Sequence, residues 1–405
     1  MTAKRILIVT DEMEVGGSQR QIVHLLRGLD RERFAPTLLF FRRPSFLVDE
    51  LRDAGVCTIH LAKSGRISPR FVWRLWRFLR REKFDLIHAY SLTAELWVRA
   101  LLPLLPSTRF IASIRGLCLV YPAWQWQLKR WILSRADAVV SNSLAGAEVA
   151  AHRTGYSLDR IDIIPNGIDI ADLINASQRD SARRLHGLPV SRPVALFVGR
   201  LVVEKNLPLL LDAMARLEVA ERPLLLIAGD GPLAQLLDEQ IALLELADDV
   251  QRLGERSDTR WLMQLADFLV LPSREEGLSN VILEAMAARA AVLASDVGGN
   301  PELVEHGRTG LLFASDDVQA LAANLQLLST DLEALGRLGA SARDHAQCHY
   351  SVAALVDRTQ SVYVRLLAGA GARQKVRSGP GAKSESQTCR GGSYSNVSPR
   401  WFDRR

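Results

Sequence analysis

The chain has 405 residues, of which 48% are hydrophobic and 24% charged, and its formal net charge is +6. These proportions exclude a mostly disordered or fibrous protein, and the length predicts two or three domains. No apolar run reaches the roughly 18 to 20 residues that a membrane-spanning helix needs, and the apolar stretch in MTAKRILIVT is too short for a signal peptide. We therefore expect a cytoplasmic protein.

Charge is distributed unevenly along the chain. Residues 1–180 carry 26 Lys and Arg against 18 Asp and Glu, whereas residues 181–370 carry 17 against 25. The last 35 residues carry 8 against 2. This asymmetry indicates that the first half meets something anionic, for which nucleic acid and a membrane surface are the two alternatives.

In the first half, short apolar runs alternate with amphipathic stretches. The expected strands are Arg5–Thr10, Thr37–Phe41, Cys57–Leu61, Asp85–Ala89, Phe110–Ile114 and Ala138–Ser141. The helical patterns between them include Ser18–Leu29, Pro69–Arg81 and Trp124–Ser134. Apolar strands that alternate with helices are typical of a parallel sheet covered on both faces.

The same pattern restarts near residue 190. Its expected strands are Val194–Val198, Leu224–Ala228, Val250–Leu253, Phe268–Leu271 and Ala291–Ala294. Its expected helices are Leu207–Leu217, Leu233–Leu244, Thr259–Leu265 and Ser279–Ala288. The polar segment Asn166–Leu188 leads into turn-forming residues at 187–193, which indicates an interdomain hinge.

We therefore predict an α/β protein with two Rossmann-like, doubly wound parallel-sheet domains at residues 1–183 and 184–350. Two such domains place a cleft at the carboxyl ends of their sheets, where these folds bind ligands. A helix over 351–368 is expected to pack back toward the first domain. Residues 369–405 are rich in Gly, Ser and Arg and poor in apolar side chains, which predicts a disordered basic tail.

The strongest local motif is EGLSNVILE, from Glu276 to Glu284, directly after an expected strand and turn. Ser279 or Asn280 suits a helix N-cap, and the free amides of Asn280 and Val281 would then face an anion. Glu284 lies one turn into that helix, near enough to bind a ribose, while Glu276 stays on the loop. The alternative is an ordinary helix start with one solvated acid and one favoured by the helix dipole.

A second motif, GRLVVEKN, starts at Gly199 after the first strand of the second domain. Its Arg200 and Lys205 can neutralise a diphosphate leaving group, a task that a metal ion performs elsewhere. The alternative is a pair of surface cations near Glu204.

Two glycine-containing loops follow other expected strands. In AGDGP, Gly229 and Asp230 either let the backbone approach a base or ribose, or only form a tight turn. In GGSQ, Gly16 and Gly17 open a helix of the first domain but lack the GxGxxG spacing of dinucleotide sites. Such a two-glycine loop suits a single phosphate.

Together, GGSQR, PNGID, VGR with EKN, GDGP, E-x7-E and GGNPELV resemble the motifs of the retaining glycosyltransferase family 4, which has the GT-B fold. The resemblance extends from about residue 5 to residue 367, with the motifs in the family's order. It implies an acceptor domain followed by a nucleotide-sugar domain, with a nucleotide-diphosphate sugar as donor substrate. It also implies no metal and no further cofactor.

Residue by residue, the resemblance implies that Arg200 and Lys205 bind the donor diphosphate and stabilise its leaving charge, and that Glu276 binds hydroxyls of the transferred sugar. These three are the expected catalytic residues. The expected donor-binding residues are Gly16, Gly17, Gly199, Gly229, Asp230, Ser279, Asn280, Val281 and Glu284.

One position departs from the family. Many members have His-Gly or His-Asp after the fifth strand of the first domain, where this chain has Arg115. An arginine cannot act as a base, but it can bind a phosphate of the donor or of a lipid-linked acceptor. His88 ends the fourth strand and is either a cleft residue or a structural hydrogen-bonding residue. With Asn166, these residues are the expected acceptor or second-domain contacts.

Two segments in the basic half interleave aromatic side chains with cations, at residues 71–81 and 124–131. On helices this composition suits a membrane interface, or else the aromatic residues cover the sheet and the arginines are solvated. Nucleic acid fits less well, because the phosphate-binding motifs lie at a domain cleft rather than along a groove. We expect peripheral contact with an anionic membrane and no nucleic-acid partner.

The predicted function is retaining transfer of a sugar from a nucleotide-diphosphate sugar to a glycan or lipid-linked saccharide. The expected context is cell-surface polysaccharide biosynthesis, such as capsule, exopolysaccharide or lipopolysaccharide O-antigen assembly. Two alternatives remain open: a non-hydrolysing nucleotide-sugar 2-epimerase of the same fold, and a non-catalytic membrane-associated protein with a degenerate transferase fold.

Overall fold

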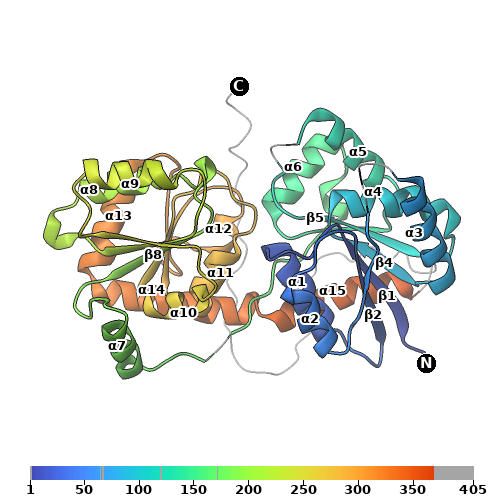
Figure 1. Cartoon of the computed structure of the whole chain (residues 1–405), viewed down its shortest axis with the longest axis horizontal. Helices are drawn as coiled ribbons and strands as arrows, with labels where there is room; N and C mark the ends of the chain where they lie inside the picture. Colours follow the sequence, from blue (N-terminus) through green and yellow to red (C-terminus); the bar gives the residue numbers. More distant parts are fainter. Residues whose placement is uncertain (1, 64, 66–67, 119–120, 171, 369–405) are drawn as a thin grey trace. The chain divides into compact units, whose positions relative to one another are not determined.

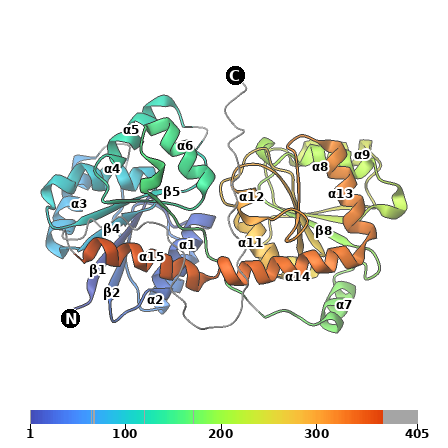
Figure 2. The same ribbon diagram turned by 180° about the vertical axis from the view of Figure 1, so that it is seen from behind.

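The computed structural model describes residues 2–63, 65, 68–118, 121–170 and 172–368. These residues form two parallel sheets flanked by helices, as Figures 1 and 2 show. The predicted α/β fold with two Rossmann-like domains is confirmed. The tail predicted at 369–405 lies outside the described residues.

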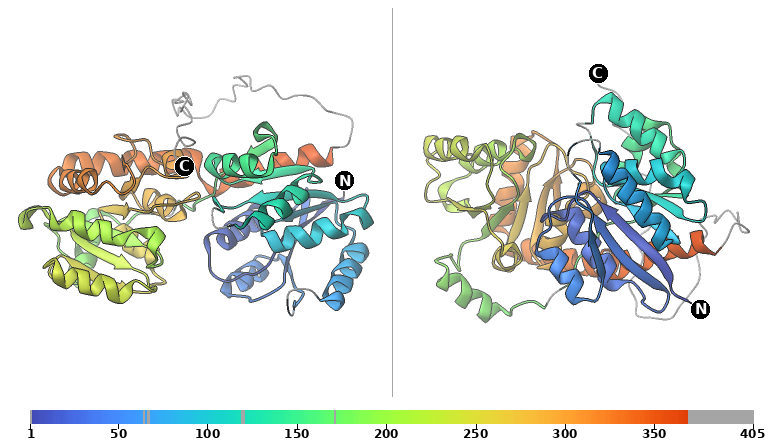
Figure 3. Two further views of the ribbon diagram at one scale, coloured as in Figure 1. Left: turned by 90° about the horizontal axis from the view of Figure 1, so that it is seen from above. Right: turned by 45° about the vertical axis from the view of Figure 1, so that its right-hand side comes forward.

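The first sheet has the strand order β3-β2-β1-β4-β5-β6-β7, with all neighbours parallel. Residues 6–9 of β1 are fully buried, because helices cover both faces of the sheet (Figure 3). The strand order reverses beside β1, which places a ligand crevice at the carboxyl ends of β1 and β4. The strands are β1 (Lys4–Thr10), β2 (Phe34–Phe40), β3 (Cys57–His60), β4 (Leu86–Ala89), β5 (Arg109–Ile114), β6 (Ala138–Ser141) and β7 (Ile161–Ile163).

Two groups of helices cover this sheet. One face packs against α1 (Gly17–Gly28), α2 (Phe46–Asp53) and α15 (Val352–Leu367). The other face packs against α3 (Pro69–Glu82), α4 (Leu92–Leu101), α5 (Ala123–Leu133) and α6 (Leu144–Thr154). Serine side chains cap the amino ends of α3, α4 and α6, which fixes where these helices begin after their loops.

The second sheet has the order β10-β9-β8-β11-β12-β13, again with all neighbours parallel. Its order reverses between β8 and β11, so a crevice is expected at their carboxyl ends. The strands are β8 (Val194–Val198), β9 (Leu224–Ala228), β10 (Val250–Gly254), β11 (Phe268–Leu271), β12 (Ala291–Ser295) and β13 (Leu311–Phe313). The helices are α7 (Ala176–Leu185), α8 (Leu207–Ala215), α9 (Ala234–Leu243), α10 (Thr259–Leu265), α11 (Asn280–Ala287), α12 (Asn300–Leu303), α13 (Val318–Thr330) and α14 (Leu332–His349).

Helix α15 returns the chain to the first sheet. It follows α14 after a break at Tyr350 and Ser351, and Ser351 forms a bridge with Ile168. Tyr363 of α15 is fully buried and packs edge-on against Phe34 of β2. The last helix is therefore part of the first sheet's core.

Helix α7 belongs by its contacts to the second sheet, because Arg179 and Arg183 both pair with Asp267 at the start of β11. The boundary predicted between residues 183 and 184 falls inside this helix, and the predicted domain ranges stay predictions. No helix among the described residues is long and apolar enough to cross a bilayer.

Candidate active site

The loops after β8 and β11 bring two predicted catalytic residues together. Lys205 ends a 3₁₀ turn over Val203–Lys205, and Glu276 lies on the loop after β11. Their side chains form an ion pair, and the Ser273 hydroxyl donates a hydrogen bond to the same carboxylate at 2.8 Å. Because β8 and β11 are parallel neighbours, their carboxyl ends meet at one edge of the sheet. A cation and a carboxylate there can contact adjacent parts of one ligand.

Two further contacts hold these loops in place. The Arg274 amide donates to the Glu204 carbonyl at 2.8 Å, and the Asn206 side chain donates to Asp316 at 3.0 Å. Arg200, the third predicted catalytic residue, is exposed, and its side chain has no ion pair among the described residues. Its charge is therefore available to an anion at this edge.

The glycines in these loops have a packing role. A Cβ at Gly229 would lie 1.9 Å from the Gly199 carbonyl oxygen, and the φ of Gly229 is 145°. Only glycine allows the loops after β8 and β9 to cross this closely. Asp230 accepts a hydrogen bond from the Gly231 amide at 2.7 Å, as in a tight turn.

The start of α11 contacts the first domain. Ser279 is its N-cap, so the amides of Asn280 and Val281 lie in the first turn, as predicted. The Asn280 side-chain oxygen accepts a hydrogen bond from Asn166 at 2.8 Å, and a Cβ at Gly17 would lie 2.2 Å from Asn280 Nδ2. The structure thus brings together Gly17, Asn166 and Asn280 from three separate motifs.

Gln21 belongs to the same cluster and was not predicted. It is buried, and it exchanges two hydrogen bonds of 3.0 and 2.7 Å with the backbone of Gly167. The available signal was its spacing, because Gln21 follows Gly17 by one helical turn and therefore lies on the same face of α1.

Glu284 lies on α11 next to Arg260 of α10. Both line a small cavity of about 40 Å³ together with Asp169 and Asp172. Burial raises the pKa of Glu284 above its ordinary value, while the charges of Arg260 and Arg20 act in the opposite direction. A largely desolvated carboxyl group at a small cavity suits hydrogen bonding to hydroxyl groups.

In the first domain, a larger cavity of about 310 Å³ lies at the carboxyl ends of β1, β4 and β5. Arg115 follows β5 and lies with its guanidinium carbon 4.3 Å from the centre of the Tyr90 ring. Its Nη1 is 3.5 Å from the Asn166 side-chain oxygen. Gly16, the N-cap of α1, supplies no side-chain cap, so the first amides of α1 remain available near this cavity.

Comparisons with known proteins cover both domains. The model for glycosyl transferases group 1 matches residues 178–345, and that for Glycosyltransferase Family 4 matches residues 15–172. The alpha-maltose-1-phosphate synthase of Mycolicibacterium smegmatis is 31% identical over 264 residues, which cover 60% of this chain and 68% of that protein. The chain belongs to glycosyltransferase family 4.

Other relatives agree with this family. The D-inositol 3-phosphate glycosyltransferase of Gordonia bronchialis is 29% identical over 312 residues, covering 72% of the transferase and 68% of that relative. Its counterpart in Nocardia farcinica is 31% identical over 284 residues, covering 65% and 62%. The transferase thus spans about two thirds of the length of the curated relatives it matches.

Solved structures share the fold. Anabaena HepE in complex with UDP superposes with a TM-score of 0.80 at 20% identity, covering 89% of the transferase and all of that chain. Sucrose-phosphate synthase from Thermosynechococcus elongatus gives 0.73 at 21% identity, covering 90% and 99%. At such identities these structures establish the fold alone.

His88 is a buried residue of the transferase rather than part of a cavity wall. Its side chain is fully buried, with Nδ1 2.8 Å from the Tyr363 hydroxyl and Nε2 2.9 Å from the Ser113 hydroxyl. Burial, helped by the charge of Arg115, holds the pKa of His88 well below its ordinary value. These contacts fit the alternative in which His88 is a structural hydrogen-bonding residue. Contact between His88 and an acceptor stays a prediction.

A buried ion pair beneath the first-domain cavity was not predicted from the sequence. Lys129 of α5 donates to both Glu95 oxygens, at 2.7 and 2.6 Å, and Glu95 also accepts from the Ser113 amide at 2.8 Å. Sequence reasoning placed Lys129 in a basic aromatic segment, and the available signal was the single acid in the mostly apolar α4. Removing one partner of such a pair typically costs about 3–5 kcal/mol.

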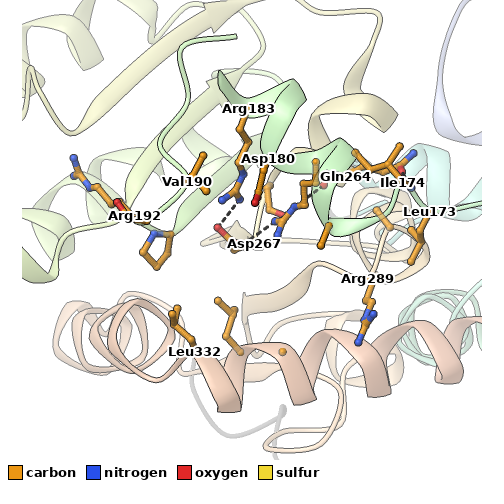
Figure 4. Close-up of a pocket in the computed structure, with 18 residues that line it drawn as sticks. Leu173, Ile174, Asp180, Arg183, Val190, Arg192, Gln264, Asp267, Arg289 and Leu332 are labelled. Carbon is orange, nitrogen blue, oxygen red and sulfur yellow. Dashed lines mark hydrogen bonds and ion pairs between the residues drawn. The ribbon is translucent and has the colours of Figure 1, made fainter. Parts of the chain in front are cut away.

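Another cavity of the transferase lies at the opposite edge of the second sheet. It has a volume of about 400 Å³ and is lined by residues of α7, α10 and α14 (Figure 4). Arg179 and Arg183 are used there to bind backbone carbonyls at the end of α10 and the Asp267 carboxylate. We interpret this region as the contact that attaches α7 to the second sheet, because Arg179, Arg183 and Arg192 are paired with carboxylates there and the cavity adjoins the amino ends of the strands.

In the described part of the chain, no three His, Cys, Asp or Glu side chains converge as metal ligands would. The roles assigned to the individual site residues stay predictions, because the geometry places these residues without identifying what they bind.

Proposed function

We propose that the transferase moves a sugar from a nucleotide-diphosphate sugar to a saccharide or lipid-linked saccharide, with retention of anomeric configuration. The observation that carries this proposal is the Lys205–Glu276 ion pair beside exposed Arg200 at the carboxyl ends of β8 and β11. Two cations can neutralise the departing diphosphate, and the carboxylate can bind hydroxyls of the transferred sugar.

The donor lies, in this proposal, along the start of α11. The first amides of α11 and the side chains of Arg200 and Lys205 hold the diphosphate. Glu284, one turn further along α11, accepts hydrogen bonds from the ribose. Uridine is the first base to test, because the solved complexes of Anabaena HepE contain UDP and UDP-glucose.

The proposed chemical step breaks the bond between the anomeric carbon and the diphosphate oxygen. The acceptor hydroxyl forms the new bond on the face that the diphosphate leaves, and its proton passes to a departing phosphate oxygen. Arg200 and Lys205 stabilise the charge that develops on the diphosphate, where preorganised cations have their largest effect. Arg115 takes no part in proton transfer, because a guanidinium stays protonated.

The acceptor and the cellular role are part of the same proposal. Trp73 of α3 and Trp124 of α5 are 53% and 61% exposed. Helix α3 carries several arginines, whereas α5 carries Arg130 and the buried, paired Lys129. Such surfaces suit contact with the headgroups of an anionic membrane. Peripheral membrane contact supports a lipid-linked acceptor, as in cell-surface polysaccharide synthesis.

A thermal-shift screen of UDP, GDP and ADP, with and without sugars, tests the donor half. A ligand that binds only the folded protein at 100 times its Kd adds about 2.7 kcal/mol to stability, so we expect one nucleotide to raise the melting temperature. Glu284→Ala should lose that shift, whereas the exposed control Arg216→Ala should keep it. If no nucleotide shifts the folded wild type at millimolar concentration, the transferase proposal fails.

A further inference from the structure

The first-domain cavity has positively charged side chains in its walls. Its walls come from the carboxyl ends of β1, β4 and β5, the start of α1 and one side of α5. They contain two cations, Arg115 and Lys129, and no Asp or Glu. The volume of about 310 Å³ is at the small end of ligand pockets, which run from roughly 300 to 1,000 Å³.

Lys129 does not contribute net charge to this cavity. Its ammonium group makes three short hydrogen bonds, two to Glu95 and one of 2.7 Å to the Ser113 carbonyl. An ammonium group has three donors, so all of them are used. The buried Glu95 carboxylate balances the charge directly beneath the wall.

The charge of Arg115, in contrast, is not balanced by a carboxylate among the described residues. Its guanidinium rests on the face of Tyr90, and its polar side-chain contacts are with uncharged groups, the Tyr90 hydroxyl and, at 3.5 Å, the Asn166 side-chain oxygen. Its Nε is buried with no hydrogen-bond partner, and no carboxylate pairs with it among the described residues. A half-buried arginine without a carboxylate partner can form charge-assisted hydrogen bonds with an anion that enters the cavity.

Two further features favour an anion on a sugar-sized molecule. The amino end of α1 reaches this cavity at Ser18 and Gln19, where the helix dipole favours negative charge. Aromatic walls are supplied by Tyr121 and Trp126, whose rings lie 5.5 Å apart. Flat aromatic surfaces beside hydrogen-bonding groups suit the apolar face and hydroxyls of a saccharide ring.

We propose that this cavity binds the acceptor through a phosphate or carboxylate on its saccharide, and that Arg115 pairs with that anion. This inference rests on the proposed transferase function and specifies its acceptor class. The donor diphosphate is the other source of an anion. We assign the anion to the acceptor, because Arg200 and Lys205 already supply cations for the donor in the second domain.

Calorimetric titration of the full chain tests the assignment. The probes are glucose 6-phosphate, glucose 1-phosphate and glucuronate, with glucose as the neutral reference and UDP as a separate titrant. The proteins are wild type, Arg115→Gln, Arg115→Lys and the control Arg153→Gln, which removes an exposed arginine from α6. Near-ultraviolet circular dichroism of each variant establishes that it is folded.

We expect wild type to bind at least one anionic saccharide about 10- to 100-fold more tightly than glucose, as a charge-assisted contact provides. Arg115→Gln should abolish this preference, and Arg115→Lys should restore part of it, because lysine keeps the charge but not the planar fork. The control should behave as wild type, and UDP affinity should be unchanged in all variants.

Three results would overturn the inference. Wild type that binds no anionic saccharide, or none better than glucose, excludes an anionic acceptor site. A folded Arg115→Gln that keeps the preference shows that another group provides it. An equal loss of UDP affinity assigns Arg115 to the donor. If UDP does not bind while Arg115-dependent saccharide binding persists, the proposed function fails and the cavity remains an anion site.

Discussion

At the scale of single residues, the ion pair between Lys205 and Glu276 is the feature on which catalysis depends in our proposal. Replacing Lys205 by alanine removes one of two cations that face the leaving diphosphate, and loss of one such stabilising group typically lowers kcat by about 10²–10³-fold. Lys205 is half-buried with one partner, so the fold should survive. Release of nucleotide from the donor identified by the thermal-shift screen measures this effect.

The control for Lys205→Ala is Arg216→Ala, which removes an exposed cation from the same domain. It should keep wild-type turnover. If Lys205→Ala retains more than about half of wild-type turnover while remaining folded, the diphosphate does not lie at this pair.

Residue motifs show how far the sequence predicts the site. Gly199 and Arg200 directly follow an apolar run, whereas Lys205 and Glu276 lie on the loops after such runs. Their position near strand ends was therefore readable from order alone. The Glu95–Lys129 pair was not readable, because its partners are 34 positions apart and meet only when α4 and α5 pack. Contacts of that kind depend on tertiary geometry that local pattern does not contain.

At the scale of elements, α3 combines core packing with an unusual outer surface. Phe71, Leu75 and Leu79 are buried against the sheet, whereas Trp73 is exposed and Arg77 lies 5.3 Å from its ring centre. The structure confirms that the inner face of this helix covers the sheet, and membrane contact of the outer face stays a prediction. The inner face is fixed by the structure, and membrane contact concerns the outer face only.

Sedimentation with vesicles tests that outer face. We expect wild type to bind vesicles with anionic lipid and not neutral ones, with affinity falling as salt rises, since each basic residue near the surface contributes about 1 kcal/mol. Trp73→Ala with Arg77→Gln should reduce binding several-fold. The matched control is Leu243→Ala with Arg216→Gln, which changes exposed residues of the second domain. Equal binding to neutral vesicles would contradict an electrostatic membrane contact.

Elements also show which parts of the fold a sequence predicts. Every strand expected from an apolar run of four to six residues is present, with ends shifted by up to three positions. The strands β7 and β13 were not expected, because each has three residues and β7 includes Asp162. Edge strands this short lack a periodic signal, and pairing with a neighbouring strand defines them instead.

At the scale of the whole molecule, three partly or fully buried histidines couple stability to pH. Burial is the largest cause in each case, lowering the pKa of His24 and His345 to about 4 and that of His88 well below its ordinary value. A histidine whose folded pKa is depressed binds its proton more readily when unfolded. Its contribution to stability is complete above pH 6.5 and is lost as pH falls toward 4.

Three carboxyl groups act in the opposite direction. Burial raises the pKa of Glu95, Glu284 and Glu302, so protonation of these groups favours the folded state as pH falls through their raised values. The histidines have an ordinary pKa of about 6.5 in the unfolded chain, so their effect begins as soon as pH falls below that value. We expect the melting temperature to fall by several degrees between pH 7.5 and 5.5, since about 1 kcal/mol shifts it by roughly 2–4 °C in a chain of 150–250 residues.

The variant His24→Gln isolates one of these groups, because His24 Nε2 is buried without a hydrogen-bond partner. The melting temperature of this variant should differ less between pH 7.5 and 5.5 than that of wild type. The control His186→Gln changes an exposed residue at the end of α7 and should leave the difference in melting temperature unchanged. Scanning calorimetry at both pH values resolves the comparison even where the two domains unfold separately. A wild type whose melting temperature rises on acidification would mean that the carboxyl groups outweigh the histidines, and it would contradict this prediction.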